Sequence, residues 1–277
     1  MTSSQTTGGA GPSAGGPDRR DRDERPTRPR RPHALLVAAE APRAVAELAW
    51  FGTSRRMLSR APRGDGHPVL VLPGFLASDV STGPMRAFLR RLGYEVLDFQ
   101  LGRNVPTPEL TERLRDRIAD LRMGDGRQTS IVGWSLGGIY ARQIARQAPD
   151  WVRVVVTLGS PFRRVPGEES TAAPAMRAMS ARGRLSLPNW SAGDEALPVP
   201  STSIFSRSDG IVPWRACLDT IGGPHETLEV KGSHSGLGHH PAALWAIADR
   251  LAQPLGRWEP MQIPSTLRPL LRSHPGA

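Results

Sequence analysis

Residues 133–138, with the sequence GWSLGG, match the pattern Gly-x-Ser-x-Gly and lie between an apolar run and a helix-like stretch that ends near Ala148. A strand ending at Val132 must turn sharply into this helix, so a serine at the turn is held in a strained backbone conformation. Glycines at 133 and 137 remove side chains that would obstruct the turn. The context of strand, turn and helix distinguishes the motif from a chance serine turn, and it predicts a nucleophile elbow with Ser135 at its tip.

Apolar runs of strand length alternate with helical periodicity on both sides of this motif. The sequence predicts strands at 68–72, 94–99, 128–132, 152–158, 202–205 and 227–230, and helices at 81–92, 108–123, 136–148 and 241–251. Continuous apolar strands are typical of a parallel sheet covered on both faces. The order predicts an α/β fold with a mainly parallel central sheet, right-handed crossovers and flanking helices, and it puts loop chemistry at the carboxyl ends of the strands.

The remaining segments suggest one domain with additions. Residues 1–32 are rich in Arg, Pro and Gly without apolar periodicity, which predicts a disordered tail. Residues 33–62 predict an N-terminal helix, interrupted or restarted at Pro42, that packs on the domain or, less favoured, associates weakly with a membrane surface. The α/β domain is expected at 63–253, with 162–200 as a small cap or lid, and 254–277 as a Pro-rich C-terminal tail.

Composition narrows the class of protein. A chain of 277 residues with 38% hydrophobic content can bury one large core. The single cysteine, Cys217, excludes an internal disulfide and is expected to be a packing residue. The net charge of +10 comes from scattered arginines, with Lys231 the only lysine, and no nucleic-acid module accompanies them, so specific nucleic-acid binding is not expected. No run of 18 apolar residues and no signal peptide pattern is found, which favours a cytoplasmic enzyme.

Partners for Ser135 are expected at other strand ends. A serine hydroxyl becomes a good nucleophile when an imidazole takes its proton and a carboxylate orients that imidazole. Asp209 directly follows the predicted strand 202–205, and His234 directly follows 227–230. The chain order Ser135, Asp209, His234 is the one that proteins with this elbow use.

Other candidates are less well placed. The alternative carboxylates are Asp194 and Glu195, in an irregular segment, and Asp219, in a helix or turn. The alternative bases are His239 and His240, which Pro241 places at a helix start, and His239 ranks next after His234. The histidines have no clustered acidic or thiol partners, so neither a metal nor a cofactor is expected.

Two backbone N–H groups must converge to stabilise an oxyanion. Leu136, at the start of the helix after the elbow, supplies one of them. The loop after the first central strand, residues 73–76 with the sequence PGFL, is placed to supply the other. Phe75 N–H is the first candidate in this loop and Leu76 N–H the second.

Five motifs together resemble the α/β-hydrolase superfamily, in its bacterial lipase and esterase branch. They are VLPGF at 71–75, GWSLGG at 133–138, LGSPF at 158–162, SDGIVP at 208–213 and GSH at 232–234. The resemblance covers about residues 66–253. It implies that Ser135 attacks an ester carbonyl, that His234 shuttles the proton and that Asp209 orients His234, while Phe75 and Leu136 bind the oxyanion. The oxyanion stretch departs from the pattern, because it lacks the histidine-glycine of many lipases.

The sequence therefore predicts a serine carboxylic-ester hydrolase that acts through an acyl-enzyme. Phe75, Leu76, Trp134 and Phe162 are expected to line an acyl pocket, which favours a hydrophobic ester or lipid-like substrate. The same triad could serve an acyltransferase or a thioesterase. A non-catalytic interaction module is a third interpretation, less favoured because such a chain need not keep all three triad residues.

Overall fold

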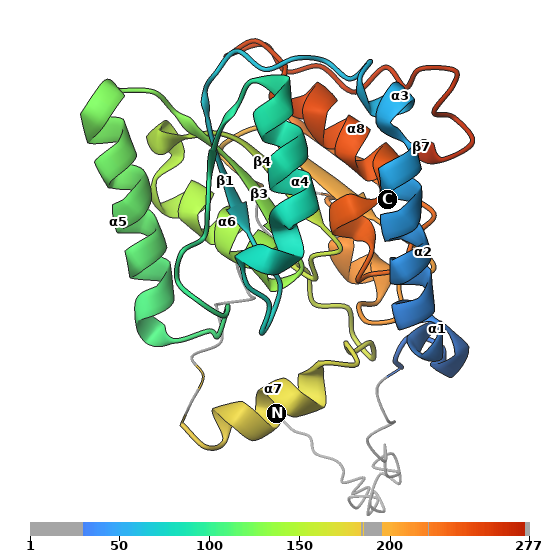
Figure 1. Ribbon diagram of the computed structural model, residues 1–277. Coiled ribbons are helices and arrows are strands. Elements are labelled where there is room, and N and C mark those ends of the chain that lie inside the picture. The colour runs from blue at the N-terminus through green and yellow to red at the C-terminus, as the bar shows by residue number, and fades with distance from the viewer. Residues whose placement is uncertain (1–29, 184, 186–195, 221, 275–277) are drawn as a thin grey trace, which may run out of the picture.

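A seven-stranded sheet forms the centre of the part of the chain that the computed structural model describes, residues 30–183, 185, 196–220 and 222–274 (Figure 1). The strands are β1 (Pro68–Leu72), β2 (Glu95–Leu97), β3 (Thr129–Trp134), β4 (Val152–Leu158), β5 (Ser201–Phe205), β6 (His225–Val230) and β7 (Leu271–His274). Their order in the sheet is β2-β1-β3-β4-β5-β6-β7. The first six pair in parallel, and β7 pairs antiparallel with β6.

Helices cover both faces of this sheet. They are α1 (Ala34–Ala38), α2 (Glu40–Thr53), α3 (Arg55–Leu58), α4 (Asp79–Leu92), α5 (Pro108–Asp125), α6 (Leu136–Gln147), α7 (Ala173–Ser180) and α8 (Pro241–Leu251), with short 3-10 helices η1 (Pro149–Trp151), η3 (Trp214–Cys217) and η4 (Leu237–His239). Val69 and Val71 pack toward α4 and α8, whereas Leu70 and Leu72 pack toward α5 and α6. This alternation leaves no strand face of β1 exposed, as expected for a doubly covered parallel sheet.

The predicted α/β fold with a mainly parallel sheet is confirmed. The strand bounds differ in part from expectation: β2 is shorter than the predicted 94–99, β3 ends two residues later than predicted and β6 begins two residues earlier. In addition, β7 lies inside the segment predicted as a C-terminal tail. Only Leu271 of β7 is buried, so its sequence carries little apolar signal. The strand forms because it pairs with the edge of β6, a long-range interaction that local propensity does not contain.

The N-terminal region forms three helices instead of one. The chain breaks at Ala39 and again at Ser54, while Pro42 sits in the first turn of α2, where a missing N–H costs nothing. One face of α2 packs against α8 and η4, which is the packing role that the sequence favours. The membrane-surface alternative finds no support, and in the described ranges no helix is both long and apolar enough to cross a bilayer.

The predicted cap segment contributes α7, which lies below the carboxyl ends of the strands in Figure 1. Residues 184 and 186–195 of this segment lie outside the described residues, as do residues 1–29 of the predicted tail. Arg30 N donates to Gly167 O at 2.6 Å, and Glu169 N donates to Arg30 O at 2.9 Å. Residues 30 and 31 thus attach to the cap segment at 167–169, and an ion pair of Arg31 with Glu169, at 2.8 Å, adds to these bonds. On the other side of the cap segment, Arg215 pairs with Glu168 at 2.9 Å.

A hydrogen-bonded chain of three polar residues, with its His67 and Ser130 members buried, lies at the amino ends of β1 and β3. His67 Nε2 is 2.7 Å from Ser130 Oγ, and His67 Nδ1 is 2.5 Å from Asp65 Oδ1. Burial lowers the pKa of His67, and the neighbouring Asp65 opposes this effect only in part. Ser130 is fully buried near the amino end of β3, where the pairing with β4 is irregular, and Ser135 lies beyond the opposite end of the same strand. Asp65, His67 and Ser130 are bonded in the order of a catalytic triad. Because the Ser130 hydroxyl is buried and inaccessible to a substrate, we interpret these bonds as structural.

Candidate active site

Ser135 occupies the turn between β3 and α6 with φ 53° and ψ −119°. This is a backbone conformation that non-glycine residues rarely adopt, and such strain is typical of functional sites. The turn is tight because α6 approaches β1 closely: a Cβ atom at Gly137 would lie 2.4 Å from Leu72 O. Ser135 N donates to Leu158 O at 2.7 Å, which fixes the turn to the end of β4. The strained turn that the sequence predicts is therefore present.

Asp209 and His234 form a buried pair on the loops after β5 and β6. Asp209 Oδ2 lies 2.6 Å from His234 Nδ1. The other carboxylate oxygen, Oδ1, accepts hydrogen bonds from the backbone N–H groups of Ile211, at 2.8 Å, and Val212, at 2.7 Å. With its second oxygen fixed in this way, Asp209 can hold the imidazole in the tautomer that carries its proton on Nδ1.

The end of β4 brings these residues to one place. Gly159, with φ 53°, packs beneath the pair: a Cβ atom there would lie 3.0 Å from His234 Nδ1 and 3.2 Å from Asp209 Oδ2. Leu158, the preceding residue, holds Ser135 through its carbonyl. Within the described chain the Ser135 hydroxyl has no hydrogen-bond partner. In unliganded enzymes the hydrogen bond between a catalytic serine and its histidine is often long and forms fully only with substrate bound.

The charge state of His234 is set by competing effects. Burial favours the neutral imidazole and lowers its pKa, but the charge and hydrogen bond of Asp209, together with the charge of Glu40, raise it. The net result is a pKa above the ordinary value of 6.5. An imidazole of this kind is a stronger proton acceptor once it is neutral, which suits a general base.

The loop after β1 carries the predicted oxyanion donors Phe75 N–H and Leu76 N–H, which differ in their hydrogen bonding. Neither Phe75 N nor Leu136 N has an acceptor in the described part of the chain, whereas Leu76 N donates to Asn104 O at 2.9 Å. Leu76 is thereby removed as a donor, which leaves the first candidate, Phe75. Asn104 also donates from its side-chain Nδ2 to Pro73 O at 2.6 Å, so it holds this loop from both ends. Sequence reasoning missed Asn104, since nothing in its local pattern indicates a long-range contact.

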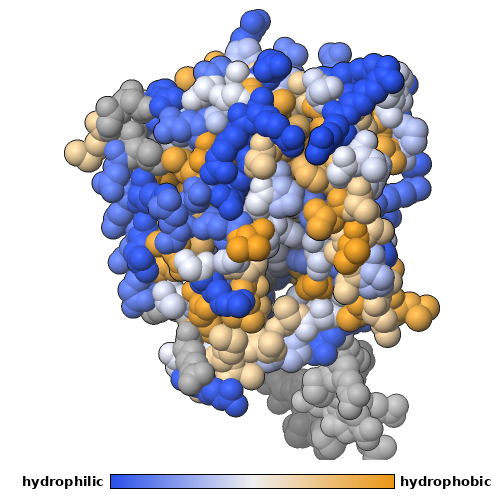
Figure 2. Space-filling model, viewed as in Figure 1, coloured by the Kyte–Doolittle hydropathy of each residue, from blue (hydrophilic) through white to orange (hydrophobic). Residues whose placement is uncertain are grey.

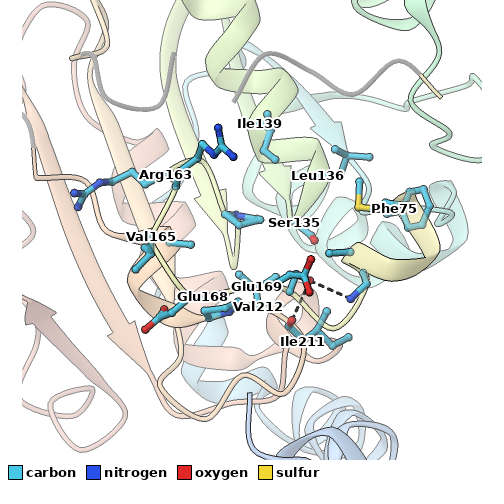
Figure 3. Close-up of a pocket in the computed structure, with 18 of the residues that line it drawn as sticks. Phe75, Ser135, Leu136, Ile139, Arg163, Val165, Glu168, Glu169, Ile211 and Val212 are labelled. Carbon is cyan, nitrogen blue, oxygen red and sulfur yellow. Dashed lines mark hydrogen bonds between the residues drawn. The ribbon is translucent and has the colours of Figure 1, made fainter. Parts of the chain in front are cut away.

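A cavity of about 480 Å³ opens beside Ser135 (Figure 3). Its apolar lining comes from Phe75, Leu136, Ile139, Val165, Met176, Ile211 and Val212. A charged rim from the cap segment adds Arg163, Arg164, Glu168 and Glu169. The volume and the mainly apolar lining fit a small hydrophobic ligand, with the serine at the cavity wall.

Three residues predicted to line an acyl pocket do not line this cavity. Trp134 projects to the other face of the sheet, where its Nε1 donates to His234 O at 3.1 Å and its ring packs on Gly238. Phe162 is buried beneath the guanidinium of Arg142, whose Cζ lies 3.9 Å from the ring centroid. Leu76 is 39% exposed on its loop. Only Phe75 of the four expected residues faces the cavity.

The alternative acid and base candidates have other partners. Asp219 pairs with Arg142 at 2.6 Å, and His239 Nε2 lies 2.9 Å from Ala44 O. His240 is the N-cap of α8, since its Nδ1 accepts from Ala243 N at 3.4 Å. Asp194 and Glu195 lie outside the described residues. Cys217 is buried, and across the described ranges no group of His, Cys, Asp and Glu could hold a metal ion.

His240 gives a prediction for stability against pH. Burial lowers the pKa of this side chain from 6.5 to about 4. Between these values the unfolded chain binds a proton that the folded chain does not, so the free energy of unfolding is highest above pH 6.5 and falls as the pH drops. We expect this group to remove roughly 3 kcal/mol between pH 6.5 and 4, with His67 adding a loss of the same sign.

Urea unfolding of the His240→Asn variant at several pH values measures this effect, because asparagine can still cap a helix but does not titrate. The matched control is His33→Asn, since His33 caps α1 while exposed to solvent. We expect the pH dependence to weaken in the first variant and to persist in the second. Equal slopes for wild type and His240→Asn would contradict the prediction.

Comparison with known proteins gives a consistent result. The model of the alpha/beta hydrolase family matches residues 69–274. A pyrethroid hydrolase from Sphingobium faniae JZ-2 superposes with a TM-score of 0.51 at 18% identity, covering 68% of this chain and 98% of that chain. The pyrethroid hydrolase PytH gives 0.50 at 18% identity, covering 66% and 96%. Among curated proteins none matches this sequence significantly. At such identities the structural likeness shows a shared fold alone.

Proposed function

The chain belongs to the alpha/beta hydrolase family, and we propose that it hydrolyses carboxylic esters through Ser135, His234 and Asp209. The observation that carries the proposal is the strained Ser135 at the wall of a mainly apolar cavity, next to loops that join His234 to Asp209 at 2.6 Å. Family membership alone would support only a hydrolase fold, because one fold hosts many chemistries.

In the first half-reaction Ser135 Oγ attacks the ester carbonyl carbon while His234 Nε2 takes the hydroxyl proton. Asp209 stabilises the imidazolium that forms. The tetrahedral intermediate collapses when the bond to the alcohol oxygen breaks, and His234 returns its proton to that oxygen. The alcohol leaves, and the acyl group remains bonded to Ser135.

In the second half-reaction water gives its proton to His234 and its oxygen attacks the acyl carbon. Collapse of this second intermediate breaks the bond to Ser135 Oγ, which regains the proton, and releases the carboxylic acid. In both steps the negative oxygen is stabilised by the N–H groups of Phe75 and Leu136, and the start of α6 adds a favourable field. Asn104 supports this role by holding the Phe75 loop in place.

The cavity favours a hydrophobic acyl or alcohol group. Its apolar lining continues from the elbow to Met176 on α7, so a short to medium chain can be buried next to Ser135. The charged rim at Glu168 and Arg163 would face the solvent-exposed part of the substrate. The three side chains first expected to recognise substrate are replaced in this proposal by Ile139, Met176 and Val212.

A fluorophosphonate probe followed by intact-mass and peptide analysis tests the proposal. We expect a single adduct on Ser135, together with hydrolysis of p-nitrophenyl esters in a series of acyl chain lengths. Repeating the assay with a competing alcohol or thiol distinguishes hydrolysis from acyl transfer by its products. The absence of any Ser135 adduct would reject the catalytic proposal and favour an interaction module.

A further inference from the structure

We propose that helix α2 holds the Asp209 and His234 loops together, and that Glu40 is the positioning residue through which it does so. The inference rests on the proposed function, because it assigns a role toward the same triad. Helix α2 precedes residues 69–274, so it lies outside the part of the chain that the family model matches.

Glu40 spans both loops with one carboxylate. Its Oε1 accepts hydrogen bonds from Gly210 N at 2.7 Å and from His234 N at 3.0 Å, and its Oε2 accepts from Ser235 N at 3.0 Å. Gly210 directly follows Asp209, so the three donors come from the two loops that carry the acid and the base. The side chain is only 6% exposed, and three N–H groups satisfy its buried charge.

Two further charged residues of α2 hold the other side of each loop. Arg43 donates to Ser208 O at 2.8 Å and to Ser208 Oγ at 3.0 Å. Glu47 accepts from Ser233 N at 2.8 Å and from Ser233 Oγ at 2.6 Å. Positions 40, 43 and 47 share one helical face. Asp209 and His234 are therefore each held at the residue before and at the residue after.

Glycines in the Asp209 and His234 loops allow α1 and α2 to approach closely. A Cβ atom at Gly210 would lie 2.5 Å from Leu36 O of α1, and one at Gly236 would lie 1.4 Å from Glu47 Oε2. A larger residue at position 210 would push the backbone of α1 away, and one at position 236 would displace the Glu47 carboxylate from Ser233. The absence of a side chain at Gly210 and Gly236 therefore allows α1 and the Glu47 side chain of α2 to approach the triad loops closely.

A helix that served only to cover the domain would be expected to dock through its apolar residues. On α2 the apolar Val45 and Leu48 are instead 68% and 46% exposed, and Figure 2 shows apolar side chains at the surface on the side where α1 and α2 lie. The charged residues face the triad loops, although burying a carboxylate is costly. The apolar contacts of α2 lie near its end, where Phe51 packs on the core and Trp50 packs on His240. They do not account for the buried charges of α2, which are explained if these act on the triad loops.

The ionisable groups around His234 come from few elements. Asp209 faces it from the loop after β5, and Glu40 faces it from α2; Arg43 and Glu47 bind the neighbouring serines, and His239 of η4 contacts the backbone of α2. Glu40 and Asp209 both raise the pKa of His234 against the effect of burial. Loss of the Glu40 charge is therefore expected to lower that pKa. A glutamine at this position keeps one acceptor oxygen, so the backbone N–H groups that face its NH2 group lose their acceptor.

The test compares Glu40→Gln with Glu112→Gln, which removes the same charge from the exposed face of α5. NMR titration should give a lower His234 pKa in Glu40→Gln. Hydrogen exchange should become about tenfold faster at the amides that face the glutamine NH2 group, either Ser235 or the pair Gly210 and His234. The kcat should fall by about 10- to 100-fold and KM should change less, because Ile211 and Val212 are the part of the cavity lining that moves with the Asp209 loop. The acid limb of the kcat/KM profile should move to lower pH, an effect that a purely structural role would not produce.

An unchanged His234 pKa together with unchanged exchange would overturn the proposal. Should Glu40→Gln fail to fold, Glu40→Asp withdraws the carboxylate by one methylene, and unchanged exchange at the three amides would count against the proposal equally. Because titration and exchange need no catalysis, they also separate the two proposals. A wild type that is inert to the fluorophosphonate but shows the NMR effects would reject the esterase and keep the role of α2.

Discussion

Replacing Ser135 with alanine is expected to lower kcat for ester hydrolysis by about 10⁴-fold or more, with KM changed little. The substitution removes the atom that forms the acyl bond, and neither His234 nor the oxyanion donors can replace it. It leaves the cavity wall intact, so the ground state should bind as before. Steady-state kinetics with a p-nitrophenyl ester and active-site titration of the wild type measure the effect.

The chain offers an internal control in Ser130, which has a histidine at 2.7 Å and, through it, a carboxylate. The Ser130→Ala variant should keep the wild-type kcat and lose about 1–3 kcal/mol of stability, because His67 is left without its partner. Retention of full activity by Ser135→Ala, or its loss in Ser130→Ala, would show that the wrong serine has been assigned.

Replacing Asp219 with alanine is expected to reduce the free energy of unfolding by about 3–5 kcal/mol. Asp219 is the ion-pair partner of Arg142, at 2.6 Å, and the two side chains are 4% and 2% exposed. Without the carboxylate the guanidinium on α6 is left charged and buried, and among the described residues the ring of Phe162 is its remaining side-chain partner. Urea denaturation at neutral pH measures the loss.

The double variant Arg142→Met with Asp219→Leu should recover most of this loss, because a packed apolar pair avoids the cost of desolvating two charges. For comparison, Glu95→Ala breaks the exposed ion pair with Arg127, also at 2.6 Å, and should cost less than about 1 kcal/mol. If the double variant were as unstable as Asp219→Ala, the loss would come from packing and not from the unpaired charge.

Much of the fold can be predicted from the sequence because its signals are local. The apolar run of β1, the glycines around Ser135 and the proline at the start of α8 each specify their own segment. Parallel strands then bring their carboxyl ends to one edge, which is why the loop positions of Asp209 and His234 could be anticipated. The structure brings those two side chains together.

What could not be predicted depends on distant partners. Trp134 was expected in the cavity, but the pleat of β3 turns its ring to the opposite face, beneath the His234 loop. Phe162 was also expected in the cavity, but its ring packs against the guanidinium of Arg142 instead. Arg142 lies 20 positions earlier in the chain, and no local sequence pattern indicates this contact. The role of Glu40 could not be predicted, because the apolar residues of its helix suggest packing or membrane contact. The polar face of the helix instead makes the contacts with Gly210 and His234.

The long separation between α2 and the triad loops also bears on how the molecule is made. Glu40 and His234 are 194 positions apart, and Glu47 and Ser233 are 186 apart, so these contacts close some of the longest loops in the chain. Such closures form slowly, because chain entropy is lost before the contact is gained. During synthesis α2 leaves the ribosome early and has no partner until the segment after β6 follows it. We therefore expect catalytic competence to arise late in folding, after the sheet around Ser135 is already in place.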